Sequence, residues 1–401
     1  MASSRKVRRV YLDHASATPV DPRVMRAMAP YFTKEFGNPS ALYDEGVRAK
    51  KAVEKARKDI AVLLSARPEE IIFTNGATES LNLALRGAVA AWKKTHPGKT
   101  PELVVSSIEH EAVLGAARAL GETGVKISYV KPDERGIVRA KDVAARLSKN
   151  TVLVSVMYAN NEIGTIQPVK EIGRLIKLWK LAHSKDYRLK TIDYPLFHTD
   201  AVQAANYLPL HVGSLNADLL TLGAGKIYGP KGIGLLYAKR GVPLGPLLTG
   251  GGQEKGMRPG TEQVPSIVGL AAALLLAQKL KDKESKRLTA LRDGFIKKLL
   301  SLPGVELNGD SKARLPNNVN IAVKGIENEL FMLRLDARGI ACSTKSACKE
   351  GSDEASHVIL SLGKSRMTAN ESLRLTLGRG TTKKDLDDTF AAIKELLAKN
   401  Y

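Results

Sequence analysis

Cysteine, tryptophan and long apolar runs are scarce in this sequence. Two cysteines and two tryptophans occur among 401 residues, and two cysteines cannot build the disulfide framework of a small secreted domain. The longest apolar run, Val268 to Ala277, is about half as long as a membrane-spanning helix requires. The basic stretch at residues 1–10 is not followed by the apolar segment of a secretory signal. We therefore expect a soluble protein of the reducing cytoplasm that does not bind a membrane.

Acidic residues are also few relative to basic ones. The chain has 41 Asp and Glu against 62 Lys and Arg, which gives a formal net charge of +21. Nucleic acid or an acidic protein would suit such a charge. The sharpest local case is one predicted helix face with Lys170, Arg174, Lys177 and Lys180. No aromatic residues interleave with these charges, so we favour a solvated helix face and expect nucleic acid to be at most an accessory partner.

Strand-like runs alternate with helical ones over the first 240 residues. Such alternation predicts an α/β protein with a mostly parallel, doubly wound sheet. A Gly- and Pro-rich connection follows at residues 241–265, and an apolar helix begins near Pro265. The length allows a second domain after that helix. The predicted buried strands cover residues 71–74, 103–107, 125–130, 151–157 and 219–222.

Four polar residues fall just after predicted strands: His110, Asn161, Asp200 and Lys226. In doubly wound sheets, the carboxyl edge of the strands is where ligands bind. Lys226 lies among glycines, 26 residues after Asp200. A lysine amine that forms a Schiff base, with an acid that keeps a pyridine nitrogen protonated, is what pyridoxal phosphate (PLP) requires. Alone, this pairing is modest evidence, because a lysine after a strand is usually just solvated.

A phosphate site is also predicted. The strand at residues 71–74 is followed by an Asn75-Gly76 turn and by a helix from Thr78. Free backbone N–H groups and the helix dipole favour an anion there. An ordinary strand–turn–helix connection would have the same pattern.

Two further features lie near the C-terminus. Cys348 is flanked by Lys345 and Lys349, which would favour the reactive thiolate, whereas Cys342 ends an apolar run and is expected to be a small buried residue. Arg374 and Arg379 would bind a carboxylate bidentately from a strand and its end, or form surface ion pairs.

Together these residues resemble the cysteine desulfurases, PLP enzymes of the class V aminotransferase family. The resemblance covers nearly the whole chain. It rests on the order and spacing of YLDHASATPV, FGNPS, FTNGATES, EHEAVL, SVMYANNEIGTIQP, HTDAVQA, GKIYGPKGIG, GMRPGTEQ, SACKEGSDEASHV and SLRLTLGRGTT. It implies the fold-type I architecture: an N-terminal segment (1–16) beside the small domain, a large PLP domain (17–262) and a small α+β domain (263–401).

The resemblance also implies how the cofactor would be held. Lys226 would attach it covalently, Asp200 would face the pyridine nitrogen and His110 would stack on the ring. Thr261 would reach the phosphate of a neighbouring subunit, which implies a homodimer. The full implied set is Ala77, Thr78, His110, Asn161, Asp200, Gln203, Lys226 and Thr261.

For the reaction, the resemblance implies that L-cysteine becomes L-alanine. Arg374 and Asn161 would bind the substrate, Lys226 and His110 would move protons, and Cys348 would take the sulfur as a persulfide. An iron–sulfur scaffold protein or a tRNA-thiolating enzyme would receive the sulfur. No metal site of its own is expected, although Cys348 is a possible contact for a nascent iron–sulfur cluster. Selenocysteine lyase, another reaction on this fold, and a weakly active assembly partner stay as alternatives.

The chain departs from the family pattern at four places. Gly223-Ala224-Gly225-Lys226 stands where the family has Ser-x-His-Lys, so two side chains that would hold the phosphate are missing. Tyr43 replaces a histidine, Lys345 stands where glycine is common, and the segment 186–197 is longer than usual. We expect weaker PLP retention or compensating contacts from backbone and Thr261.

Overall fold

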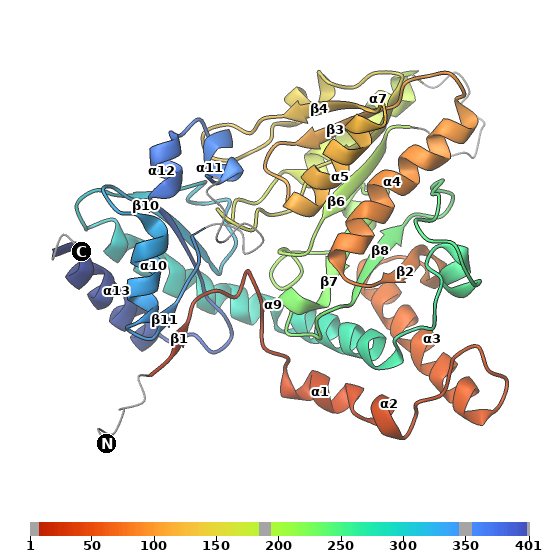
Figure 1. The fold of residues 1–401 in the computed structure, drawn as a ribbon, viewed down its shortest axis with the longest axis horizontal. Coiled ribbons are helices and arrows are strands. Elements are labelled where there is room, and N and C mark those ends of the chain that lie inside the picture. Colours follow the sequence, from red (N-terminus) through yellow and green to blue (C-terminus); the bar gives the residue numbers. More distant parts are fainter. Residues whose placement is uncertain (1–7, 184–193, 345–354, 399–401) are drawn as a thin grey trace.

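The computed structural model describes residues 8–183, 194–344 and 355–398. It has two lobes (Figure 1). The larger lobe is built on a seven-stranded sheet and the smaller lobe on a three-stranded sheet. One long helix, α9 (Val264–Leu299), runs from one lobe into the other.

The large sheet has the strand order β2-β8-β7-β6-β5-β3-β4. Neighbouring strands are parallel, except that β8 runs antiparallel to both β2 and β7. Most of these strands are buried along their whole length, as expected for a sheet with both faces covered. The predicted mostly parallel sheet is therefore confirmed. The strands are β2 (Ile71–Thr74), β3 (Glu102–Ser106), β4 (Lys126–Val130), β5 (Thr151–Ser155), β6 (Leu196–Asp200), β7 (Leu219–Gly223) and β8 (Gly234–Ala238).

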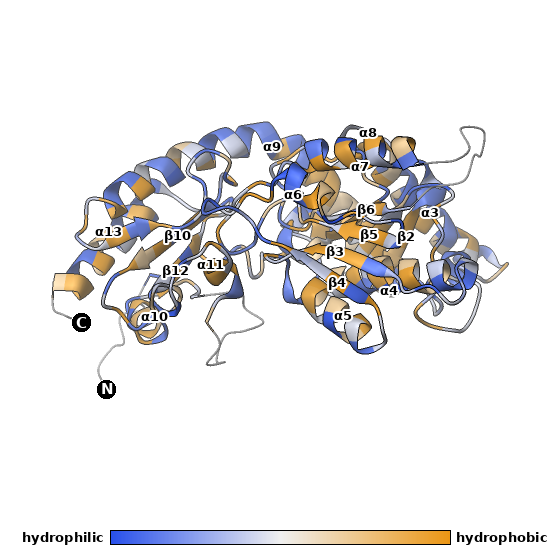
Figure 2. Cartoon of the chain, turned by 90° about the horizontal axis from the view of Figure 1, so that it is seen from above, coloured by the Kyte–Doolittle hydropathy of each residue, from blue (hydrophilic) through white to orange (hydrophobic). Residues whose placement is uncertain are grey.

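Helices cover both faces of this sheet (Figure 2). One face is covered by α4 (Ala77–Thr95) and α5 (Glu111–Glu122). The other face packs against the first half of α9 together with α3 (Asp44–Leu64), α6 (Ala140–Ala144), α7 (Val169–His183) and α8 (Val212–Leu215). Two short helices, α1 (Pro22–Met28) and α2 (Pro30–Thr33), contact α9. The doubly wound arrangement is the predicted one.

The smaller lobe holds an antiparallel sheet of order β12-β10-β9. The N-terminal strand β1 (Val10–Tyr11) pairs in parallel with β11 (Ile340–Ala341), so the start of the described chain lies in this lobe. The other elements are β9 (Val305–Leu307), β10 (Asn318–Val323), β12 (Ser372–Thr376), α10 (Asn328–Asp336), α11 (His357–Ser361), α12 (Arg366–Asn370) and α13 (Lys383–Ala398).

Helix α9 contributes to the cores of both lobes. Its buried residues from Val264 to Ala277 belong to the core of the larger lobe, and those from Leu288 to Leu299 belong to the core of the smaller one. Among the described residues, α9 is one helix that is long and apolar enough to cross a membrane by length and composition alone. Its packing against α1, α3 and α13 identifies it here as a core helix.

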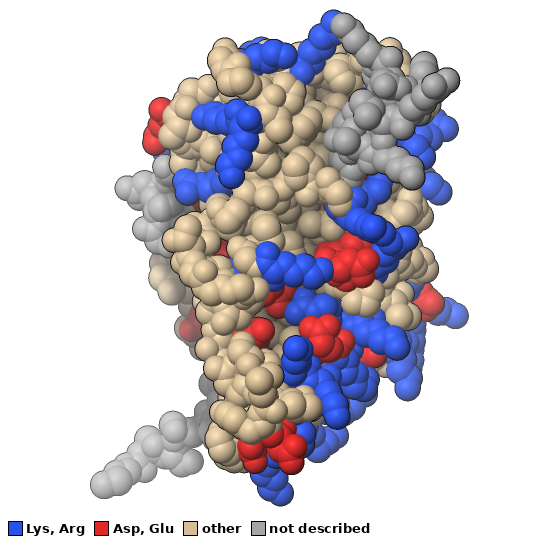
Figure 3. All heavy atoms as spheres, turned by 90° about the vertical axis from the view of Figure 1, so that its right-hand side faces the viewer, with Lys and Arg blue, Asp and Glu red and all other residues tan. Residues whose placement is uncertain are grey.

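The predicted solvated face of α7 is confirmed for three of its four basic residues. Lys170, Arg174 and Lys177 are exposed, but Lys180 is only 15% exposed and pairs with the buried Asp218 at 2.8 Å. The prediction is wrong for Lys180 because the helix end turns toward β7 and brings the ammonium group to that carboxylate. On the face shown in Figure 3, Lys and Arg are spread widely, with acidic residues among them in its lower half.

Candidate active site

Residues from distant parts of the chain line one cavity of about 270 Å³ at the carboxyl edge of the large sheet. Eight predicted residues line it, and they come from strand ends, from the start of α4 and from the smaller lobe. Asp200 ends β6, Lys226 follows β7, and Arg374 comes from β12. The predicted residues that line the cavity are Ala77, Thr78, His110, Asn161, Asp200, Gln203, Lys226 and Arg374.

Lys226 ends a short 3-10 helix (Ala224–Lys226) directly after β7. Its ammonium group donates to the carbonyl of Ser16. The turn is held from both sides: Asn206 donates to the Lys226 carbonyl at 2.7 Å, and the backbone of Thr18 donates to the Gly225 carbonyl at 3.1 Å. The N-terminal segment therefore closes the cavity beside the predicted cofactor lysine.

Asp200 is buried at the end of β6, and its Oδ1 accepts a hydrogen bond from the backbone of Val202 at 2.9 Å. Burial raises the pKa of Asp200 to about 6, and the nearby Lys226 charge counteracts that shift. A cationic nitrogen placed against this carboxylate would be strongly favoured, because it would compensate the buried negative charge. Gln203, three residues on, donates to the Ala15 carbonyl at 3.0 Å.

His110 caps the N-terminus of α5. Its Nδ1 accepts from the backbone N–H of Ala112 at 3.1 Å, so the neutral ring carries its proton on Nε2. Burial lowers the pKa of His110 to about 4, with a further contribution from the Lys226 charge. The ring is therefore neutral at physiological pH.

Glu109 precedes this histidine and is fully buried. One carboxyl oxygen accepts from the Met157 backbone at 2.7 Å, and the other has no hydrogen-bond partner in the described structure. Burial raises the pKa of Glu109 to about 8, and the Asp200 charge adds to the shift. The side chain is thus a buried acid that is mostly protonated near neutral pH.

The predicted anion site is formed by the turn between β2 and α4. Gly76 has a φ of +92°, a conformation that glycine adopts without strain. The first N–H groups of a helix have no partner within it, and the first two residues of α4, Ala77 and Thr78, line the cavity. A Cβ atom at Gly234 would lie 2.7 Å from the Gly76 carbonyl carbon, so only glycine lets β8 approach this turn so closely.

Arg374 is 1% exposed and lies at the opposite end of the cavity. Its guanidinium donates to Asp13 at 2.8 Å, to the Ser16 hydroxyl at 2.7 Å and to the Asn161 carbonyl at 3.2 Å. Within the described residues, its Nε atom and the Asn161 Oδ1 atom are buried without a hydrogen-bond partner. These two orphaned atoms, one donor and one acceptor, suit a ligand that carries both a carboxylate and a donor group.

Arg379 does not join the site. It pairs with Asp21 at 3.1 Å and lies over the ring of Tyr228 at 4.0 Å. For this residue the ion-pair alternative holds, and for Arg374 the surface alternative is wrong because the residue is buried. Cys342 is buried, as expected.

Two predicted residues cannot be placed in the cavity. Thr261 is exposed in the loop before α9 and does not line it. Cys348, Lys345 and Lys349 lie outside the described residues, as does most of the long segment at 186–197. The roles given to Thr261 and Cys348 stay predictions.

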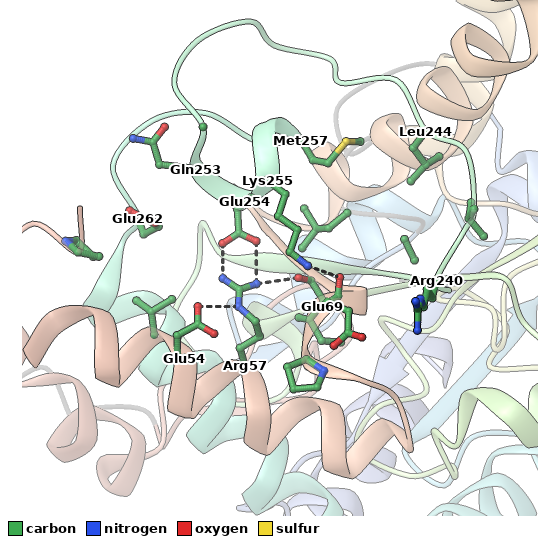
Figure 4. A pocket seen from close by; sticks show the side chains of 18 of the residues that line it. Glu54, Arg57, Glu69, Arg240, Leu244, Gln253, Glu254, Lys255, Met257 and Glu262 are labelled. Carbon is green, nitrogen blue, oxygen red and sulfur yellow. Dashed lines mark hydrogen bonds and ion pairs between the residues drawn. The ribbon is translucent and has the colours of Figure 1, made fainter. Parts of the chain in front are cut away.

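The loop that carries Thr261 is held behind the anion site. Glu254 pairs with Arg57 at 2.6 Å (Figure 4). It also accepts a hydrogen bond from the backbone N–H of Phe73 at 2.9 Å. The loop and α3 also line a larger cavity of about 930 Å³. Its lining contains both acidic and basic residues and none of the predicted cofactor residues, so the reaction is not assigned to it.

The site also holds residues to which sequence reasoning gave no role: Asp13, Ser16, Glu109, Met157 and Lys231. Asp13 and Ser16 lie in the YLDHAS segment, which resembled the family, but no role followed for either of them. Their roles depend on contacts between residues far apart in the sequence: Asp13 and Ser16 bind Arg374, and Ser16 also binds Lys226. Within the described residues, no three His, Cys, Asp or Glu side chains gather as a metal site.

The lining fits PLP. An amine, a buried carboxylate and a helix N-terminus are the groups that its aldehyde, ring nitrogen and phosphate require. The Asn161 and Arg374 atoms that lack a partner within the described residues could bind a second ligand, an amino acid, in the same cavity.

Comparison with known proteins agrees with this geometry. The family model described as aminotransferase class-V matches residues 10–388. The chain belongs to the class-V aminotransferase family. It is 43% identical over 393 residues to "Cysteine desulfurase IscS" of Clostridium botulinum, covering 97% of this chain and 94% of that protein.

Solved structures of class-V relatives have the same fold. A structure titled "NIFS-LIKE PROTEIN" is 33% identical with a TM-score of 0.88, covering 98% of this chain and 100% of that one. A second structure, titled "SspA in complex with cysteine", is 34% identical with a TM-score of 0.78, and the match covers 92% of this chain and 98% of that one. The predicted fold-type I architecture is confirmed, and so is PLP as the cofactor of this family.

Proposed function

We propose that this class-V aminotransferase is a PLP-dependent cysteine desulfurase that converts L-cysteine to L-alanine and captures the sulfur on Cys348. The observation that carries the proposal is the convergence of Lys226, Asp200, His110 and Arg374 on one cavity. The names of its relatives support the substrate. They do not favour selenocysteine lyase or an inactive assembly partner.

In this proposal, Arg374 binds the substrate carboxylate through its free Nε and one terminal nitrogen. The Asn161 amide orients the same substrate. PLP, held by Lys226, Asp200, Gln203 and the turn at Ala77 and Thr78, supplies an electron sink that makes the substrate Cα–H and Cβ–S bonds labile. Lys226 takes the Cα proton, and the neutral His110 donates a hydrogen bond from Nε2.

Cys348 would take the sulfur. Its thiolate attacks the substrate sulfur, the Cβ–S bond breaks, an S–S bond forms and the substrate β-carbon gains a proton that the thiol has lost. The atoms of the products, L-alanine and an enzyme persulfide, equal those of the reactants, L-cysteine and the free thiol.

The contacts made by the two residues that flank the segment carrying Cys348, Ser343 and Ser356, support its role as sulfur acceptor. Ser343 exchanges two backbone hydrogen bonds with Arg374, at 3.1 and 2.7 Å. On the other side, the Ser356 hydroxyl donates to Glu162, next to Asn161, at 2.5 Å. Cys348 is five residues after Ser343, so the chain length keeps it within about 18 Å of Ser343.

The test is production of L-alanine and sulfide from L-cysteine by the purified protein, with and without added PLP. Wild type is expected to make both products in equal amounts in the presence of a thiol reductant. Cys348→Ser should lose both while keeping the visible absorbance of bound PLP, and Lys226→Ala should lose that absorbance as well. Alanine formation by Cys348→Ser at the wild-type rate would refute the assigned sulfur acceptor.

We also propose a homodimer, in which Thr261 reaches the partner's phosphate site. Exposed apolar side chains near α2 support a subunit contact: Phe32 is 59% exposed, Phe36 69% and Leu42 94%. Phe36→Glu should shift the mass in solution from two chains to one. The same proposal includes the sulfur acceptor and the cytoplasmic location. It also includes the division of the chain into an N-terminal segment (1–16), a large domain (17–262) and a small domain (263–401).

A further inference from the structure

Three lysine and arginine side chains line the 270 Å³ cavity: Lys226, Lys231 and Arg374. The proposed function uses Lys226 for the cofactor aldehyde and Arg374 for the substrate carboxylate. Lys231 is left without a role. We propose that Lys231 is the cationic ligand of the cofactor phosphate, and this inference rests on the proposed function.

The position of Lys231 supports this assignment. It lies on the turn between Lys226 and β8, and the next residue, Gly232, has a φ of +77°. A Cβ atom built on Gly232 would lie 3.9 Å from the Asn75 side chain. The Lys231 turn therefore lies against the β2–α4 turn, whose free N–H groups form the predicted phosphate site.

Two glycines stand where the family pattern has side chains that would hold the phosphate. Gly223 and Gly225 both line the cavity. A Cβ atom at Gly225 would lie 3.5 Å from the Lys231 Cγ atom, at ordinary contact distance. The stem of Lys231 thus passes directly beside the bare backbone of Gly225 and occupies the neighbourhood of the missing side chain.

The ammonium group of Lys231 is also available. Its only hydrogen bond in the described structure goes to the Thr18 carbonyl at 3.2 Å. An ammonium group has three donors. A dianionic phosphate at the helix N-terminus would give this ammonium group a strong acceptor in the same cavity.

The test is the affinity of the apo-protein for PLP and for pyridoxal, which lacks the phosphate, measured by absorbance or fluorescence titration. Lys231→Met is expected to weaken PLP binding at least tenfold, because a charge-assisted hydrogen bond is lost, while pyridoxal binding changes less than twofold. Lys170→Met, an exposed lysine on α7, is the matched control and should leave both affinities unchanged.

Gly225→His offers a rescue. A Cβ atom at this position would lie at ordinary contact distance from Lys231, so we expect Lys231→Met/Gly225→His to recover most of the lost PLP affinity. Inorganic phosphate should raise the melting temperature of the wild-type apo-protein, and it should do so less for Lys231→Met.

The outcomes separate the two proposals. Equal PLP affinity in wild type and Lys231→Met would overturn the assignment of Lys231 alone. An equal loss of PLP and pyridoxal affinity would also overturn it, because the effect would then be on the cavity and not on the phosphate. A wild-type protein that binds no PLP would instead refute the proposed function.

Discussion

The guanidinium of Arg374 is paired with Asp13 at 2.8 Å, although 361 residues separate the two in the sequence. Arg374 is 1% exposed and Asp13 is 15% exposed. A buried arginine is costly unless a carboxylate compensates its charge. Asp13 therefore compensates the buried charge of Arg374 and orients its guanidinium before any substrate carboxylate arrives.

The first prediction concerns this pair. Asp13→Asn should lower the free energy of unfolding by about 1–3 kcal/mol, because it leaves a buried charge without its counter-charge. Urea denaturation at pH 7 measures it. Asp336→Asn is the control, since it removes an exposed partner of the exposed Arg9 and should cost less than about 1 kcal/mol. Equal losses for the two variants would contradict the role of Asp13.

A second prediction concerns Glu109, whose pKa burial raises to about 8. When a group has a higher pKa in the folded than in the unfolded state, its contribution to folding stability is fully present below its unfolded-state pKa. That contribution is lost as pH rises through its folded-state pKa. Glu109→Gln mimics the protonated acid and removes that loss. The apo-form of Glu109→Gln should match wild type at pH 4.5 and exceed it at pH 8 by on the order of 3 kcal/mol.

Unfolding of both apo-proteins at several pH values measures the difference. The neighbouring His110 works in the opposite direction, because its lowered pKa reduces stability as pH falls from 6.5 toward 4. Its contribution is common to both proteins and cancels in the comparison. A stability difference that does not change with pH would be evidence against a titrating Glu109.

The third prediction concerns the ion pair between Arg57 and Glu254. The Glu254 side chain is 3% exposed and that of Arg57 is 11% exposed, so either single change to alanine leaves a buried charge and should cost about 3 kcal/mol. The double variant should cost less than the sum by at least about 1 kcal/mol, as measured by a double-mutant cycle in urea. Additive losses would show that the two charges do not stabilise each other.

The fourth prediction concerns the close approach of β8 to the phosphate turn. Gly234→Ala would place a Cβ atom 2.8 Å from both the Ala77 nitrogen and the Leu222 carbonyl oxygen. It should cost about 1–3 kcal/mol of stability and weaken PLP binding. Gly213→Ala in α8, where a Cβ atom would meet nothing within 4 Å, is the control and should be neutral or slightly stabilising. A Gly234→Ala protein as stable as this control would contradict the described packing.

Much of the fold was predictable because its signals are local. The strand at Ile71–Thr74 matches its prediction residue for residue, since a buried apolar run ends there at an Asn-Gly turn. The cavity was predictable in part, because polar residues at the ends of parallel strands must meet at one edge. Lys180 was misjudged because its partner, Asp218, comes from a strand end that helix periodicity cannot identify. Asp13 and Lys231 stayed without roles for the same reason, since their meaning depends on contacts across the fold.

Helix α9 is shared by the cores of both lobes, with Leu270 and Leu274 packed in one and Phe295 and Leu299 in the other. Its backbone hydrogen bonds continue without interruption from one core to the other. The two lobes are therefore coupled mechanically and thermodynamically, because loss of either core removes the support of half of a common helix. A cofactor that binds only the larger lobe will in consequence also protect the smaller lobe, including β12 and its arginine, from local unfolding.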